Sequence, residues 1–143
     1  MKIRGSDDWG SGHYGASRGY SLHNGVDVVN SPGDPIQSLT YGTVSKVGWC
    51  YSWKKHPDRM HLRYVQVTLD GNDFRYFYCK PTAAQGDKIK PGDELGIAHD
   101  LNAVFVDDRK RPMTQHFHLE VIGTDGEFVN PSDMIPEIKE ALE

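Results

Sequence analysis

The chain has 143 residues, 37% of them hydrophobic and 25% charged, which is enough to bury a core, and we expect one domain over residues 1–143. Its formal net charge of -4 argues against a nucleic-acid-binding protein, which would usually carry a basic surplus. No apolar run approaches the ~20 residues that cross a bilayer, and the N-terminus lacks the apolar segment of a signal peptide, so neither feature is expected.

Short apolar or alternating segments, separated by glycine, proline and aspartate, predict an all-β fold that is mostly antiparallel. The strands are expected at residues 26–29, 36–49 (two short strands around Gly42), 62–69, 74–80 and 116–123. The sequence Asp-Gly-Asn-Asp predicts a hairpin turn between the strands that end at 69 and begin at 74. Two Gly-Asp turns surround short apolar pairs within residues 85–98.

The remaining segments are expected to be long loops, with one helix at the end. Residues 1–22 are glycine-rich, and residues 51–61 and 99–113 have the composition of polar loops. Only "PEIKEALE" (136–143) has a helical pattern, because Pro136 suits a first helical position and apolar residues follow on one side.

The two cysteines, Cys50 and Cys79, have no CxxC spacing and no thiolate cluster beside them. Cys79 lies in an aromatic segment and is expected to be a small core residue. We expect two free thiols, although a disulfide between them stays open.

The stretch "TQHFHLE" (114–120) places two histidines one residue apart. Successive side chains of a strand point to opposite faces, so His116, His118 and Glu120 share one face, while Phe117 and Leu119 lie on an apolar face. Paired histidines on such a strand are either solvated polar residues or metal-binding or catalytic groups, and this stretch alone is compatible with both.

A second polar pair occurs in "LHNGVDVV" (22–29), where a loop enters the first strand. His23 and Asp27 lie four residues apart, and Gly25 between them would let the backbone bend so that both side chains converge. Zinc binds imidazole nitrogen and carboxylate oxygen, and a catalytic site uses three protein ligands with a fourth position open. His23, Asp27 and one histidine of the H-x-H pair would supply three ligands. The alternative is a surface histidine and a turn aspartate.

These stretches resemble the lysostaphin/LytM-type zinc endopeptidases, which cut peptidoglycan cross-bridges and stem peptides. The resemblance covers residues 10–131 and rests on H-x-G-x-D, "SPGDPIQSLTYGTV", "GDKIKPGDELG" and "HFHLEV". It implies a β-sheet domain with an open groove, the duplicated hybrid motif. In the family, the first motif gives two zinc ligands and the second histidine of H-x-H gives the third. The resemblance therefore implies that the zinc ligands are His23, Asp27 and His118. The resemblance also implies that His116 is the family's catalytic histidine.

The chain departs from the family at "RYFYCKP", where the usual pattern is Y-x-H-L. Tyr78 stands in place of that histidine, which is the family's second catalytic residue. The leukocyte chemotaxin branch has the same replacement, keeps the zinc ligands and is generally regarded as non-peptidase; phage-encoded peptidases look similar through "GASRG…HNGVD". A phenol with a pKa of about 10 is a poor base at neutral pH but can donate a hydrogen bond to an oxyanion. His116 and Tyr78 are therefore the predicted catalytic residues, and packing alone is the alternative for Tyr78.

The resemblance thus implies a Zn2+-dependent endopeptidase that hydrolyses a stem peptide or cross-bridge of peptidoglycan, as in a cell-wall lytic enzyme of the phage endolysin kind. Without a signal peptide, we expect synthesis in the cytoplasm and action on the bacterial cell wall after release. A monomer is favoured, with nothing in the sequence that fixes the oligomeric state. The alternative is a catalytically inactive, zinc-containing binding module of the same fold, as in the chemotaxin branch.

Overall fold

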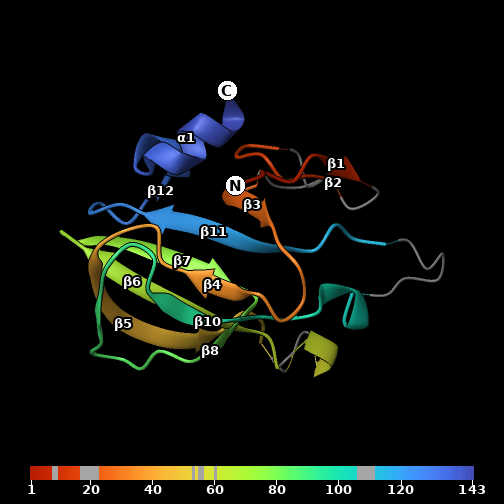
Figure 1. The fold of residues 1–143 in the computed structure, drawn as a ribbon, viewed down its shortest axis with the longest axis horizontal. Coiled ribbons are helices and arrows are strands. Elements are labelled where there is room, and N and C mark those ends of the chain that lie inside the picture. Colours follow the sequence, from red (N-terminus) through yellow and green to blue (C-terminus); the bar gives the residue numbers. More distant parts are fainter. Residues whose placement is uncertain (8–9, 17–22, 53, 55–56, 60, 106–111) are drawn as a thin grey trace.

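The structure is a computed structural model in which residues 1–7, 10–16, 23–52, 54, 57–59, 61–105 and 112–143 are described. Within these residues the chain forms three β-sheets and one short α-helix near the C-terminus (Figure 1). No helix in this part of the chain has the length and apolar character needed to cross a membrane.

The strands are β1 (Ser6–Asp7), β2 (Gly10–Ser11), β3 (Gly25–Val29), β4 (Pro35–Gln37), β5 (Gly42–Trp49), β6 (Arg63–Leu69), β7 (Asn72–Phe77), β8 (Cys79–Pro81), β9 (Lys88–Ile89), β10 (Glu94–Ala98), β11 (His116–Ile122) and β12 (Phe128–Val129). The helices are the 3-10 turns η1 (Pro57–Arg59), η2 (Leu101–Ala103) and η3 (Pro131–Asp133) and the α-helix α1 (Pro136–Leu142).

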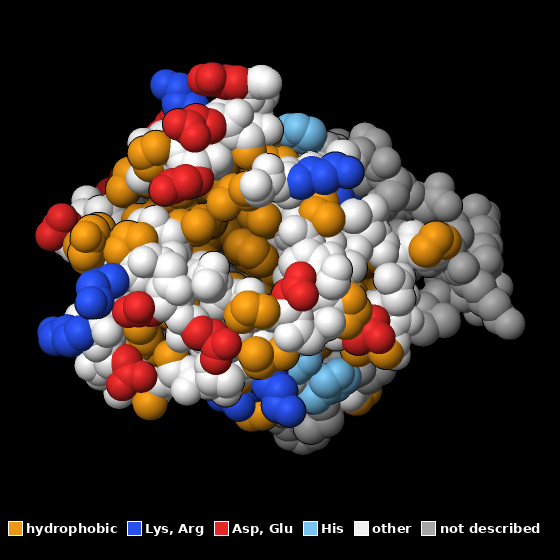
Figure 2. All heavy atoms as spheres, viewed as in Figure 1, with side chains coloured by type: hydrophobic (Ala, Val, Ile, Leu, Met, Phe, Trp, Pro, Cys, Tyr) orange, Lys and Arg blue, Asp and Glu red, His pale blue; other side chains and the backbone are white. Residues whose placement is uncertain are grey.

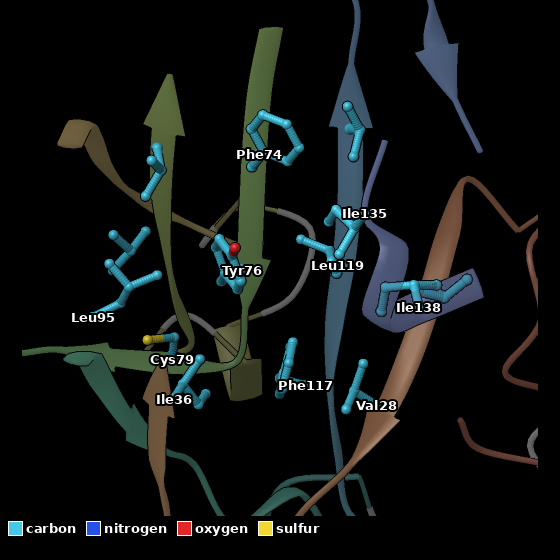
Figure 3. Packing of buried hydrophobic residues seen from close by; sticks show 14 of the residues in the cluster. Val28, Ile36, Phe74, Tyr76, Cys79, Leu95, Phe117, Leu119, Ile135 and Ile138 are labelled. Atoms are coloured by element: carbon cyan, nitrogen blue, oxygen red, sulfur yellow. The ribbon is translucent and has the colours of Figure 1, made fainter. Parts of the chain in front are cut away.

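The seven-stranded sheet has the order β12-β11-β7-β6-β5-β9, with β3 also paired to β11, and a three-stranded sheet has the order β4-β10-β8. All the strand pairs among the described residues are antiparallel. The main core lies between the two sheets, where Ile36 and Leu95 of the small sheet lie near Tyr76 of the large one (Figure 3). Ile135 and Ile138 extend this core beside Leu119. The predicted antiparallel β fold with a short C-terminal helix is therefore confirmed.

Most predicted strands lie within a few residues of their expected positions. The β6–β7 hairpin turns at Asp70 and Gly71, whose φ angles of 52° and 81° are both positive. Two consecutive left-handed residues are the requirement of a two-residue type I′ turn, which Asp-Gly satisfies. The segment 36–49 divides into β4 and β5 as expected, although Gly42 begins β5 instead of separating the strands.

The prediction of one strand over 74–80 is wrong, because the chain bends at Tyr78. Strand β7 ends at Phe77, and β8 begins at Cys79 and pairs with β10 in the other sheet. Tyr78 has a φ of 66°, a left-handed conformation that is uncommon for a bulky residue and costs roughly 1–2 kcal/mol. The bend moves the chain from one sheet to the other. It also takes Tyr78 off the core face that strict alternation would have assigned to it.

The segments 51–61 and 99–113, predicted as polar loops, contain a second small core. Leu62, Leu101 and Phe105 are buried together there, and η2 contributes Leu101. Tyr78 packs against this cluster and not within the main core. Because the cluster lies beside His116 and His118, the histidine-bearing face of β11 forms part of a walled cleft and not the open surface that its polar sequence suggests.

Candidate metal centre

Two neighbouring strands bring the predicted ligands together. His118 of β11 lies directly opposite Asp27 of β3 in the antiparallel register, so the two side chains point to the same face. His23 comes just before β3. A Cβ at Gly25 would collide with the carbonyl group of Leu119 on β11. The glycine of H-x-G-x-D is therefore needed for the close approach of the two strands and not, as predicted, for a bend.

Three potential ligand atoms form a compact triangle. Nδ1 of His118 lies 2.9 Å from Oδ1 of Asp27, and Nε2 of His23 lies 3.2 Å from the same oxygen. The two ring nitrogens are 3.0 Å apart. A tetrahedral zinc ion with bonds of ~2.0–2.1 Å would hold its ligand atoms roughly 3.3 Å apart, so the triangle is within a few tenths of an ångström of that spacing. The cluster could bind a metal ion.

The other ring nitrogen of each histidine already has an acceptor. Nδ1 of His23 lies 2.9 Å from the carbonyl oxygen of His13, and Nε2 of His118 lies 3.0 Å from Oε1 of Glu120. A metal-binding histidine usually donates its second ring N–H to a carbonyl or carboxylate, which fixes the tautomer. Hydrogens on these two outer nitrogens would leave lone pairs on the two inner ones. Two lone pairs 3.0 Å apart favour a cation between them.

The pKa shifts of Asp27 and His118 also favour positive charge at the centre of the cluster. Burial alone would raise the pKa of Asp27, but hydrogen bonds with His118 and His23 outweigh it and hold that pKa well below its usual range. Without a metal ion, the two carboxylates would instead hold a proton on the inner nitrogen of His118: burial alone would lower the pKa of His118, but hydrogen bonds to Asp27 and Glu120 raise it to about 9. The Asp27 carboxylate therefore stays ionised and favours positive charge at the centre, which a proton on His118 or a divalent cation supplies. Two imidazoles and one carboxylate fit zinc.

Arg4 holds the second oxygen of Asp27. Its Nε and Nη2 atoms both lie 3.0 Å from Oδ2, and its side chain is only 3% exposed. The backbone of Arg4 is also bonded to that of Asp27 through a 2.8 Å N–H···O contact. Because Oδ2 is occupied by a guanidinium, Oδ1 is the oxygen that remains directed at His23 and His118. Arg4 thus orients the carboxylate.

His116 lies beside the cluster and is not part of the triangle. Its Nδ1 is 2.7 Å from the carbonyl oxygen of Thr114, which accepts a hydrogen from that nitrogen and leaves the Nε2 lone pair directed toward the site. Nε2 lies 3.6 Å from Oδ2 of Asp27. Burial lowers the pKa of His116, although Asp27 partly opposes this. A neutral imidazole with a free lone pair can accept a proton.

The ring of Tyr78 meets that of His116 edge to face, with centroids 5.6 Å apart. Its hydroxyl oxygen lies 3.0 Å from that of Tyr51, and either group can be the donor. Phe77 also faces the site, with its ring centroid 5.3 Å from that of His118. The bend at Tyr78 therefore places two consecutive aromatic side chains on the same side of the sheet, which regular β geometry does not allow.

A cleft of about 310 Å³ opens over these residues. The metal-site side chains form its floor, and its walls come from the two long loops, through residues that include Tyr51, Arg59, Phe105 and Met113. All five residues singled out from the sequence line this cleft: His23, Asp27, Tyr78, His116 and His118.

Sequence reasoning missed Arg4 and Tyr51 as members of the site. Glu120 was predicted to share one strand face with His116 and His118. This alternation along the strand is the sequence feature that could have predicted its contact with His118. No spacing or motif connects Arg4 to Asp27, because the contact comes from tertiary packing of the N-terminal segment against β3.

No protein-family model matches the chain. The chain is 30% identical to leukocyte cell-derived chemotaxin-2 of Bos taurus over 119 residues, which make up 83% of this chain and 72% of that protein. The chemotaxin-2 of Mus musculus is likewise 30% identical, over 121 residues.

Solved structures of several proteins share the fold, among them two catalytic domains. The catalytic domain of the prophage-encoded M23 protein EnpA from Enterococcus faecalis, solved in a mutant form, aligns with a TM-score of 0.60 and 22% identity over 86% of this chain and 88% of that one. The catalytic domain of the antimicrobial peptidase lysostaphin from Staphylococcus simulans aligns with a TM-score of 0.57 and 17% identity over 87% of each chain.

Proposed function

Since this chain belongs to the lysostaphin/LytM-type metallopeptidase family, we propose that it is a zinc-dependent endopeptidase that hydrolyses a peptide bond in bacterial peptidoglycan. One observation carries the proposal: the donor triangle of His23, Asp27 and His118 opens into a cleft that also contains the Nε2 atom of a neutral His116. A site with only a structural role would need no proton acceptor beside its ligands.

Zinc held by His23, Asp27 and His118 would polarise the scissile carbonyl and favour ionisation of the attacking water. His116 would accept the proton of that water at Nε2 and return it to the leaving amine. Its Nδ1–H stays bonded to the carbonyl oxygen of Thr114, which keeps the ring in one tautomer through both transfers. General acid–base help from one residue contributes ~10²–10⁴-fold in rate.

Tyr78 would donate a hydrogen bond from its hydroxyl to the oxyanion that develops on the substrate. Burial raises the pKa of Tyr78 well above that of a free phenol, so the hydroxyl keeps its hydrogen at neutral pH. Tyr51 can donate to the Tyr78 oxygen, 3.0 Å away, while Tyr78 donates to the substrate. The Tyr51–Tyr78 pair thus provides a neutral hydrogen-bond donor where the family usually has a second histidine. The site has one potential base fewer as a result.

A specific observation favours the second candidate, a zinc-containing binding module without hydrolysis. The chain is 30% identical to chemotaxin-2, and the Tyr78 hydroxyl already has a hydrogen-bond partner in Tyr51. In that case the cleft would hold a peptide without cleaving it. A lytic role at the cell wall, of the phage endolysin kind, would follow from hydrolysis and stays a prediction.

The proposal is tested by incubating zinc-loaded protein with purified peptidoglycan and measuring new amino termini. His116→Ala is the matched control, because it removes the proton acceptor and retains all three ligands. Release by the wild type and a loss of several orders of magnitude in the variant, at equal zinc content, are expected. Equal release by both proteins would exclude His116 as the base, and release by neither would favour the binding module.

A further inference from the structure

Two hollows lie near the cleft at the end of β5, on opposite faces of the β5–β6 pair, because the Trp49–Arg63 pair comes next to the Gly48–Tyr64 pair in the register. The first, of about 620 Å³, is lined by residues 46–52 and Tyr64, and it shares Cys50 and Tyr51 with the cleft. The second, of about 570 Å³, adjoins the first at Val47 and Trp49. A substrate peptide that leaves the cleft and passes over the edge of β5 at Trp49 would meet both hollows, and we call the two hollows the extension of the cleft.

The side chains that define this extension are basic or aromatic. We call it the basic groove, formed by Lys46, Trp49, His61, Arg63, Lys80 and His99. Among the described residues that line the two hollows there is no aspartate or glutamate, although the whole chain has a net charge of -4. A cleft lined by one sign of charge concentrates ligands of the opposite sign. In Figure 2, histidine and Lys/Arg side chains gather along the lower edge, in the region of β8 and β10 in Figure 1.

The centre of the groove is a preformed pair, Arg63 on Trp49. Trp49 is 59% exposed at the end of β5, and the guanidinium carbon of Arg63 lies 3.9 Å from the centroid of its ring. Nε of Arg63 donates to the carbonyl oxygen of Gly48 at 3.0 Å, which fixes the plane of the guanidinium. Within the described part of the chain, its two terminal nitrogens have no hydrogen-bond partner. A fixed guanidinium with open terminal N–H groups is the geometry that binds a carboxylate through two hydrogen bonds.

The histidines at the far end lie in the same positive field. The rings of His61 and His99 meet edge to face with centroids 5.9 Å apart. Burial lowers the pKa of His99, and His61, Lys80 and Arg63 lower it further. Nε2 of His99 is buried and has no hydrogen-bond partner among the described residues. The described residues that line the groove include Lys46, Arg63 and Lys80 but no acidic side chain, so a bound anion would neutralise part of this positive charge.

We propose that the basic groove binds a free carboxylate of the substrate peptide, with Arg63 as its principal contact, so that the carboxylate-bearing stem peptide and not an uncharged cross-bridge is the substrate. This rests on the proposed peptidoglycan function. An uncharged bridge offers nothing to pair with Lys46, Arg63 and Lys80. The faces of Trp49 and Tyr64 would contact the aliphatic part of the peptide.

The test measures binding, so it does not depend on turnover. Two synthetic stem peptides are compared by calorimetry on zinc-loaded protein that carries His116→Ala to prevent cleavage: one with free carboxylates and one with the same groups as carboxamides. Arg63→Gln is then introduced, with Lys88→Gln as the charge-matched control. Lys88 is exposed on β9 and lies near Thr43, at the opposite end of β5 from Trp49.

The free acid is expected to bind at least about tenfold more tightly than the amide, the size of one charge-assisted contact. Arg63→Gln should abolish this preference and Lys88→Gln should preserve it, while Trp49→Ala weakens both peptides. Equal binding of the two peptides, no binding of either, or a preference that survives Arg63→Gln would overturn the proposal. Displacement of the peptide by an equal concentration of inorganic phosphate would do the same. Tight, carboxylate-dependent binding by a protein that cleaves no peptidoglycan would support the groove and contradict only the peptidase function.

Discussion

Replacing Tyr78 by phenylalanine separates chemistry from packing at this site. The ring keeps its contacts with His116 and Phe105, and only the hydroxyl, 3.0 Å from that of Tyr51, is lost. If that hydroxyl stabilises the oxyanion, kcat should fall ~10²–10³-fold, or ~2.7–4 kcal/mol. The free energy of unfolding should fall by only about 1 kcal/mol, because one hydrogen bond between the two hydroxyls is lost. Initial rates of amino-terminus release and urea unfolding of the zinc-loaded proteins measure the two effects.

Tyr51→Phe is the matched control for this experiment. It deletes the same hydrogen bond from the other side, together with the contact of the Tyr51 hydroxyl with Arg59, so the loss of stability should be at least as large, but Tyr78 keeps its hydroxyl and turnover should fall far less. Tyr78→His restores the usual family residue and should retain or raise activity, since histidine tolerates the left-handed backbone at this position better than tyrosine does. If Tyr78→Phe cleaves as fast as the wild type, or if both Phe variants lose turnover equally, Tyr78 only packs and His116 must act without an oxyanion donor.

Elemental analysis should find about one zinc per chain, and His118→Ala should abolish it while His116→Ala retains most of it; zinc that survives loss of His118 would show the ligands to be misassigned. Arg4→Met, which releases the carboxylate that Arg4 orients, should weaken zinc binding by roughly 10–100-fold in competition with a chromophoric chelator, and an unchanged affinity would refute the orienting role. Burial raises the pKa of the partly buried Cys50 and the buried Cys79 thiols to about 12, so both should react with a thiol reagent at pH 8 far more slowly in the folded than in the unfolded protein, and rapid labelling of the folded chain would contradict these raised pKa values.

The metal site could be predicted because its residues sit in short, regular patterns. The two-residue period of β11 placed His116 and His118 on one face, and the H-x-G-x-D spacing grouped His23 with Asp27. The choice of His118 as the third ligand followed from the family resemblance, while its position opposite Asp27 in the strand register came from the structure. The side chains on β3 and β11 are held by backbone hydrogen bonds, so a correct strand prediction already fixes where they point.

The features that sequence reasoning missed depend on tertiary contacts. Tyr78 belongs to a residue type that seldom adopts positive φ, so alternation along "FRYFYCK" predicted an unbroken strand where the chain changes sheets. Leu101 and Phe105 belong to the short stretch "LNAVFV" (101–106) in a segment predicted as a polar loop, and their packing against Leu62 makes that segment a wall of the cleft. Arg4 reaches Asp27 across the fold without any motif. Local patterns and the family resemblance therefore predicted the candidate ligands, while the residues that orient them and the walls of the cleft required the structure.

The central claim, that metal held in this cleft cleaves peptidoglycan, is tested most directly by removal and return of zinc in one sample. Release of amino termini from purified peptidoglycan is measured for the zinc-loaded protein, after treatment with a chelator, and after zinc is added back. We expect release that is lost with the metal and recovered with it, while the protein stays folded throughout by circular dichroism. Release that persists in metal-free protein, or a folded, zinc-loaded protein that liberates no amino termini from any peptidoglycan, would contradict the claim.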